Sequence, residues 1–105
     1  MPFPPKRQHK IDLAEAKAMT KKHRDDSPGG GGERAHMFPR DVFEALLQNP
    51  KVKGIRLYHG KGTGGESSII AVGVDDDGND LLDGDIFDRG YPCPPFCTGA
   101  GGLNG

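Results

Sequence analysis

The sequence predicts an α+β fold, in which a three-stranded antiparallel meander packs against one helix and a glycine-rich linker joins a separate N-terminal helix. Three observations support this prediction. Apolar side chains recur at helical spacing over residues 42–47. Residues 67–75 form a nearly continuous apolar run, typical of a central strand. An Asp-Gly pair at residues 77–78 then separates that run from another apolar segment, which favours a hairpin.

Composition limits the size of the core. Hydrophobic residues make up 33% of the 105 positions, and 17 glycines and 9 prolines gather in four stretches, so about 60–70 residues remain that can pack. A single core of that size is marginal, and a partner surface or self-association would relieve the limit. We expect five segments: a disordered proline-rich basic tail (1–10), the N-terminal helix (11–24), the glycine-rich linker (25–35), the α+β core (36–91) and a Cys/Pro/Gly-rich tail (92–105).

The N-terminal helix has a clear start and a thin apolar face. Asp12 is placed to cap it, and Glu15 lies three residues further on, which is the spacing of a capping box. Leu13, Ala16 and Met19 are its few apolar residues. We therefore expect this helix to dock weakly on its own core, or on a partner.

The second helix and the strands are expected to form the core. Pro39 suits a first helical position, and Asn49 ends the helix because a residue that precedes proline avoids helical backbone angles. The expected strands are residues 54–59, residues 67–75 and residues 81–87, the last interrupted by a bulge at residues 83–85.

Charge is balanced overall but uneven along the chain. The net charge is −1, with 14 basic and 15 acidic residues, so no overall field points to nucleic acid or a membrane. The N-terminal third is basic and residues 75–88 are acidic, which describes either two solvated faces or a head-to-tail attraction between molecules. No apolar run is long enough for a membrane span or a signal peptide, so a cytoplasmic location is expected. The expected partner-contacting residues are Lys17, Lys21, Lys22, Arg24 and Phe96.

The two cysteines, Cys93 and Cys97, lie in the stretch Pro-Cys-Pro-Pro-Phe-Cys and leave several interpretations open. In a cytoplasmic chain they are expected to be reduced. A disulfide across the two prolines is possible but geometrically demanding. A zinc or iron site would need further ligands, such as His36, His59 or a second subunit. The simplest interpretation is a proline-stiffened segment that packs Phe96.

The remaining motifs do not indicate an enzyme. The glycine loop after His59 fails the phosphate-loop pattern, because Ile55 occupies the required glycine position and a strand follows. The aspartates near Gly78 do not match the calcium-loop spacing. A spatially assembled set such as His59, Asp85 and Cys93 fixes no reaction class. We expect no catalytic residues and no cofactor.

Four short pieces in this order resemble a group of small uncharacterised bacterial proteins of the Bacteroidota type. The pieces are Phe-Pro-Arg-Asp-Val (38–42), Gly-Ile-Arg-Leu-Tyr (54–58), Val-Gly-Val-Asp with Gly-Asn-Asp (72–80) and Pro-Cys-Pro-Pro-Phe-Cys (92–97). The resemblance covers residues 11–97 and implies a bacterial source, and it implies that the Cys-Pro-Pro-aromatic-Cys ending belongs to the group. It implies no activity.

The function expected from these features is that of a non-enzymatic interaction or self-assembling structural module. Its partner would be another protein or a second copy of itself, because a three-stranded sheet has edges that can pair. The N-terminal helix and the cysteine-proline end would act as partner-contacting arms. The alternative is a thiol or metal-binding module that uses Cys93 and Cys97.

Overall fold

The structure, a computed structural model, describes residues 3–27, 34–99 and 101–103. The chain divides into two compact units: unit 1 comprises Met1–Lys6 and Phe38–Gly90, and unit 2 comprises Arg7–Met37 and Tyr91–Gly105. Most of the predicted glycine-rich linker lies outside the described residues.

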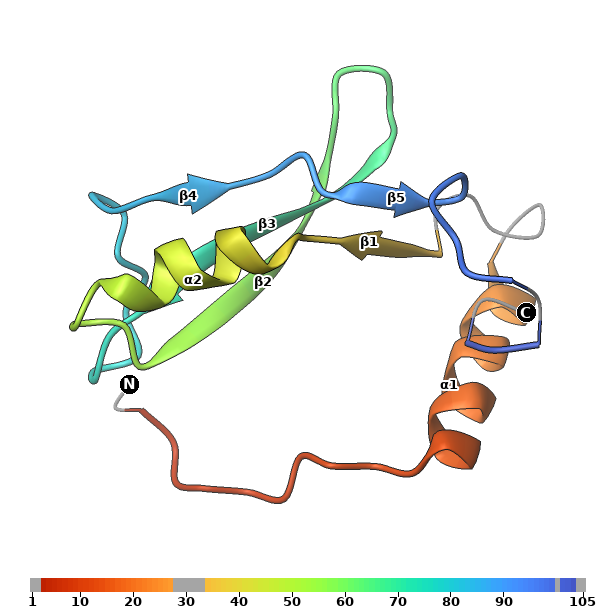
Figure 1. Cartoon of the computed structure of the whole chain (residues 1–105), viewed down its shortest axis with the longest axis horizontal. Coiled ribbons are helices and arrows are strands. Elements are labelled where there is room, and N and C mark those ends of the chain that lie inside the picture. Colours follow the sequence, from red (N-terminus) through yellow and green to blue (C-terminus); the bar gives the residue numbers. More distant parts are fainter. Residues whose placement is uncertain (1–2, 28–33, 100, 104–105) are drawn as a thin grey trace. The chain divides into compact units, whose positions relative to one another are not determined.

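Unit 1 contains the α+β core that the sequence predicts (Figure 1). Its elements are α2 (Arg40–Gln48), β2 (Gly54–Lys61), β3 (Ser67–Val74) and β4 (Ile86–Phe87). The three strands form one antiparallel sheet in the order β2-β3-β4, and α2 packs on β3. Helix α2 is flanked by Pro39 and Asn49, so the predicted boundaries are confirmed to within one residue.

Strand β3 is the centre of this sheet. Its residues 71–74 are all buried, whereas β2 and β4 are mostly half-buried or exposed. A Cβ atom added at Gly73 would lie 2.7 Å from Cγ2 of Val52, so only glycine lets the segment after α2 approach β3 this closely. The nearly continuous apolar run is therefore explained by burial on both faces.

The predicted Asp-Gly hairpin is confirmed, with a loop one residue longer than the tightest turn. The Gly78 N–H donates to the Asp75 carbonyl (3.0 Å), and the Asp75 N–H donates to the Asn79 carbonyl (3.0 Å). Gly78 has φ = 82°, a backbone angle that favours glycine. The Asp75 carboxylate accepts the N–H groups of Asp77 and Asn79, which closes the loop from inside.

The return strand departs further from its predicted form. Val74 pairs with Asp80, and Val72 pairs with Ile86. The two paired residues are therefore two positions apart on β3 but six positions apart on the return segment. The extra residues form a turn that is closed by a bond from the Gly84 N–H to the Leu81 carbonyl (3.2 Å). The predicted bulge at residues 83–85 is therefore wrong, because the chain leaves the ladder in a full turn.

Unit 2 combines the two segments that the sequence predicts as separate arms. Its elements are α1 (Leu13–Asp26), β1 (Ala35–Met37) and β5 (Tyr91–Cys93), and β1 and β5 pair antiparallel as a two-stranded sheet. The predicted cap of α1 is confirmed, since the Asp12 carboxylate accepts the Glu15 N–H at 2.8 Å. Helix α1 continues two residues past its predicted end, because Ser27 caps it by bonding the carbonyls of His23 and Arg24.

The small core makes unit 1 sensitive to one leucine of α2. Leu46 is 3% exposed and its neighbour Leu47 is 59% exposed. We expect Leu46→Ala to lower the free energy of unfolding by about 2–5 kcal/mol, through lost burial and the cavity left behind. Leu47→Ala, the matched control, should change it by less than about 0.5 kcal/mol. Urea denaturation followed by circular dichroism measures both, and equal losses would contradict the described packing of α2.

Candidate functional site

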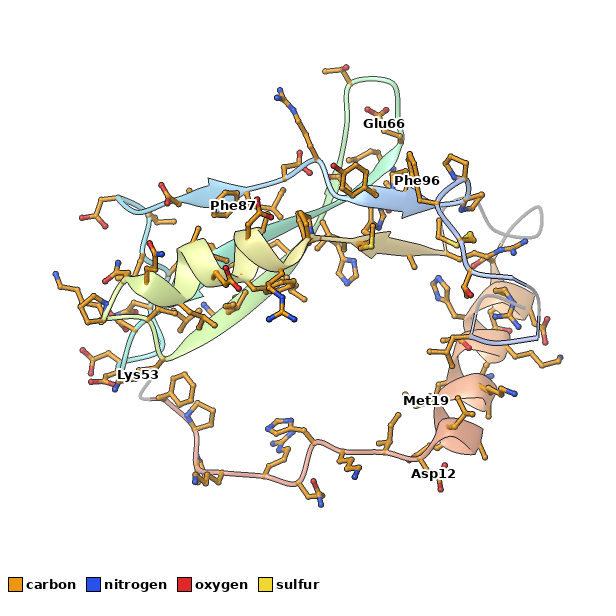
Figure 2. The ribbon with its side chains drawn as sticks, in the orientation of Figure 1. Asp12, Met19, Lys53, Glu66, Phe87 and Phe96 are labelled. Carbon is orange, nitrogen blue, oxygen red and sulfur yellow. A yellow bond between two sulfur atoms is a disulfide. The ribbon has the colours of Figure 1, made fainter. Side chains whose placement is uncertain are left out.

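Cys93 and Cys97 are joined by a disulfide at the end of β5 (Figure 2). Their Cα atoms lie 4.9 Å apart, inside the range that a disulfide can span. Main-chain bonds hold the loop between them: the Phe96 N–H donates to the Pro92 carbonyl and the Cys97 N–H to the Pro95 carbonyl, both at 2.9 Å. The expectation of reduced thiols is thus corrected, because the loop folds back far enough to bring both sulfurs together.

The bridge has one buried and one exposed end. Cys93 is 6% exposed and Cys97 lies on the surface. The Cys93 main chain is anchored in the β1–β5 sheet, where its carbonyl also accepts the Arg34 N–H at 2.5 Å. The Phe96 ring packs edge-on against Tyr91, with ring centroids 5.3 Å apart. Phe96 therefore packs within this loop, as the simplest sequence interpretation expected, while its side chain stays exposed.

The predicted metal ligands are distributed over both units. His36 pairs with Pro92 and Ala35 pairs with Cys93, so His36 and Cys93 point to opposite faces of the two-stranded sheet. His59 belongs to unit 1, on β2. Among the described residues no three His, Cys, Asp or Glu side chains form a group that could hold a metal ion. Zinc or iron at Cys93 and Cys97 would require the bridge to be reduced and further ligands to be recruited.

An apolar cavity of ≈ 270 Å³ lies beside the bridge within unit 2. It is bounded by Thr20 of α1, by Ala35 of β1, and by Phe96 and Leu103 of the C-terminal segment. The Arg24 guanidinium donates to the Leu103 carbonyl (2.6 Å), which ties that segment to the helix. Arg24, predicted to contact a partner, thus has an internal role in the unit.

The remaining predicted contact residues of α1 lie on its exposed surface. Lys21 pairs with Asp25 (2.6 Å) and Lys22 pairs with Asp26 (3.4 Å), both one helical turn apart. Exposed pairs of this kind contribute about 0.3–0.5 kcal/mol, so these charges remain available to a partner. The side of α1 that packs is largely polar. Its half-buried residues are Ala16, Thr20, Arg24 and, at the C-terminal cap, Ser27. Leu13 and Met19 are left exposed (Met19 in Figure 2).

A polar cluster that the sequence did not reveal lies on unit 1. The Arg56 guanidinium donates to one carboxylate oxygen of Asp80 (2.5 Å) and to the Gly78 carbonyl (3.2 Å). The Tyr58 hydroxyl donates to the other Asp80 oxygen. Arg56 and Tyr58 lie two residues apart on β2, so they share a face of the sheet. That alternation is the sequence signal, but finding Asp80 required the register of the return strand.

The cluster covers the sheet face opposite α2. Val72 pairs directly with Arg56, and Val74 pairs with Asp80, so all four side chains share one face. The bond from Arg56 to Asp80 therefore crosses above Val72 and Val74, both of which are buried. The cluster shields apolar core side chains on this face, and the Phe3 ring packs on the same face over Gly54.

The hydrogen bonds inside the cluster shift the pKa values of its three side chains. The hydrogen bond from Tyr58, helped by Arg56, lowers the pKa of the Asp80 carboxyl. The same bond raises the pKa of the Tyr58 hydroxyl, and the bond to Asp80 raises that of the Arg56 guanidinium. These shifts stabilise the charge states that exist near neutral pH.

The glycine loop after β2 is a hairpin connection, closed by bonds from the Gly62 N–H to the Glu66 carbonyl (2.8 Å) and from the Gly65 N–H to the Gly62 carbonyl (3.0 Å).

The candidate enzyme set is divided between the units, since His59 and Asp85 belong to unit 1 and Cys93 to unit 2. In the described part of the chain, no helix has the length and apolar character needed to cross a bilayer.

The polar cluster predicts how stability depends on pH. Folding lowers the pKa of the Asp80 carboxyl. Its contribution to the free energy of unfolding is therefore fully present above the pKa of the unfolded chain, roughly 4, and is lost as the pH falls through the folded pKa. Because folding raises the pKa of Tyr58, its contribution is complete below roughly pH 10 and is lost as the pH rises through the folded pKa. In a plot of melting temperature against pH, Asp80→Asn should reduce both the fall at acid pH and the fall at alkaline pH. The exposed control Asp83→Asn should leave both limbs of the plot as they are in the wild type. Unchanged limbs in Asp80→Asn would contradict the cluster.

Comparison with protein-family models, with curated proteins and with solved structures gave no match to this chain. The resemblance to small bacterial proteins therefore stays a prediction.

Proposed function

We propose that this protein is a small non-enzymatic interaction module that works by presenting surfaces to a protein partner. One observation supports the proposal most directly. The described residues bury five apolar side chains, whereas thirteen large apolar side chains are exposed. Single exposed apolar residues are common, but here the exposed large apolar side chains outnumber the buried apolar residues. A bound partner would cover part of that surface.

The exposed apolar residues occur on both units. On unit 2 they include Leu13 and Met19 of α1 and Phe96 beside the bridge; on unit 1 they include Leu57 of β2 and Ile86 of β4. On α1 they are interspersed with Lys17, Lys21 and Lys22. A surface that combines apolar and basic side chains suits a partner with an acidic and apolar surface.

The arrangement of titratable groups favours binding over catalysis. Arg56, Tyr58 and Asp80 satisfy one another through their own hydrogen bonds, and the carboxylate lies over packed valines. Cys93 is held in the disulfide, where it is not a nucleophile. A self-assembling version of the module stays part of the proposal, because the sheet of unit 1 has a long edge strand.

If the protein is an interaction module, it should form a complex with a protein partner in its native cells, and that complex should depend on the folded state. Wild-type protein, cross-linked in intact cells, should form one discrete adduct of constant stoichiometry, and light scattering should show whether the purified chain self-associates. The Leu46→Ala variant, whose core is weakened, is the matched control and should lose the adduct. A strictly monomeric protein without any discrete adduct would overturn the proposed function.

A second candidate function is a thiol–disulfide module, and the bridge itself favours it. Cys97 is the exposed sulfur, so an external thiolate would attack Cys97 and release the buried Cys93 thiolate. A persistent bridge also favours an oxidising compartment over the predicted cytoplasm. Reduction of the same pair is the condition for the metal-binding alternative.

The redox state of the pair can be measured directly. If the bridge is structural, blocking free thiols in intact cells before lysis should leave Cys93 and Cys97 unmodified, and reduction should then add about two daltons. A Cys97→Ser variant supplies the reference mass for one free thiol. Finding both thiols already blocked in cells would favour the thiol or metal-binding alternative, and native mass spectrometry would then show whether zinc or iron is bound.

A further inference from the structure

The two edges of the unit 1 sheet are built differently. Strand β4 has two residues, follows a turn that leaves the ladder, and is flanked by Asp85 and Asp88. Short length, interruption and charge are the devices that proteins use to prevent pairing at a sheet edge. Strand β2 has eight residues in unbroken register with β3 and no proline. One edge is therefore blocked against pairing, and the other is not.

The register identifies which main-chain groups of β2 face outward. The hairpin closes with a bond from the Gly62 N–H to the Glu66 carbonyl, and hydrogen-bonded pairs alternate in an antiparallel ladder. Arg56 and Tyr58 therefore bond to β3, and the N–H and carbonyl groups of Ile55 and Leu57 point away from it. The Gly73 carbonyl, opposite Ile55, supports this register, because it accepts the Leu81 N–H on the other side of β3.

An open groove of ≈ 370 Å³ runs along the same part of β2. Gly54 and Arg56 line it on the sheet face that carries Val74, Ile55 and Leu57 adjoin it along the strand, and Phe3 and Pro4 line it from the N-terminal segment. That segment is fixed to unit 1 by a bond from the Phe3 N–H to the Asp76 carbonyl (3.0 Å). The groove thus combines outward-facing main-chain groups with walls that are apolar at Phe3, Pro4 and Val74, which is what an extended peptide needs to bind as an added strand.

Charge distinguishes between the possible occupants. Between residues 51 and 61 the chain carries Lys51, Lys53, Arg56 and Lys61 and no acidic residue. A second copy of β2 paired antiparallel about Leu57 would place Lys53 opposite Lys61, and like charges that face each other destabilise a strand pair. Arg56 is already paired with Asp80, and Lys53 lies 3.9 Å from Asp76 in an exposed ion pair. Exposed pairs of this kind contribute little, so the flanking lysines still favour an acidic strand.

We propose that the open edge of β2 is a strand-acceptor site for an extended acidic segment of another protein. The segment adds to the sheet beside β2 by hydrogen bonds to Ile55, Leu57 and His59. Its alternate side chains lie in the groove on the Arg56 face, and its carboxylates, which point to the opposite face, lie near Lys53 and Lys61. The inference rests on the proposed interaction function and specifies its binding surface.

Leu57→Pro tests the site because it removes an outward-facing N–H and leaves the ladder with β3 intact. Proline is tolerated at such positions of edge strands, and Arg56 before it already has the extended backbone that proline requires. Leu57→Thr, which keeps the N–H, is the matched control. The probe is a short capped peptide that alternates valine with glutamate, and a peptide with lysine in place of glutamate is its counterpart.

Addition of the glutamate peptide to the full-length wild-type protein should shift the backbone amide NMR signals of Ile55, Leu57 and His59 and slow their hydrogen exchange. Leu57→Pro should weaken binding about tenfold, while Leu57→Thr should bind as the wild type does. The double variant Lys53→Glu with Lys61→Glu, which does not depend on proline, should prefer the lysine peptide.

Three results would overturn the proposal: equal binding by Leu57→Pro and wild type, shifts confined to α1, or no shift with either peptide. A dimer that Leu57→Pro converts to monomer without added peptide would also overturn it, in favour of a second copy. These outcomes differ from failure of the proposed function. If wild type and Leu57→Pro form the same adduct in cells, the interaction function stands and the β2 site does not.

Discussion

The burial of four consecutive residues of β3, at positions 71–74, is the constraint on which unit 1 depends. A strand buried on both faces needs cover above and below and a neighbour on each side. Helix α2 covers the face that carries Ala71, and the Arg56–Tyr58–Asp80 cluster spans the face that carries Val72. The polar cluster, with the Phe3 ring that packs over Gly54, therefore covers the face that a second helix covers in larger α+β domains.

The elements that could be predicted from the sequence are those with local signals. The apolar run of β3, the Asp-Gly turn, the Asp12 cap and the end of α2 at Asn49 each depend on residues within one turn or strand. The β1–β5 sheet could not be predicted in this way, because it joins two three-residue strands more than fifty positions apart, and neither strand is long enough to show a periodicity. The Arg56–Tyr58–Asp80 cluster could not be predicted from the sequence for a related reason. It depends on the register of the return strand, and that strand leaves its ladder between Asp80 and Ile86.

The cysteine pair shows a different limit of sequence reasoning. The spacing of Cys93 and Cys97 allowed a thiol pair, a metal site or a bridge, and the intervening prolines argued for an extended chain. In the structure the loop folds back, and bonds from the N–H groups of Phe96 and Cys97 hold it. The two predicted arms form one unit because α1, whose packed face is largely polar, is tied to the C-terminal segment through Arg24. Amphipathic periodicity could not reveal a helix that docks by its polar side.

The incomplete core and the open edge of unit 1 have a common physical cause. A three-stranded sheet gives only its middle strand two neighbours, so β2 satisfies half of its main-chain groups with protein and leaves the other half to water. An added strand beside β2 would make β2 an interior strand and bring the sheet to four strands, within the common size range. It would also cover Leu57, which is exposed at present. Main-chain pairing and apolar burial would then be gained in one step, whereas β4 is prevented from gaining either by its short length and its flanking aspartates.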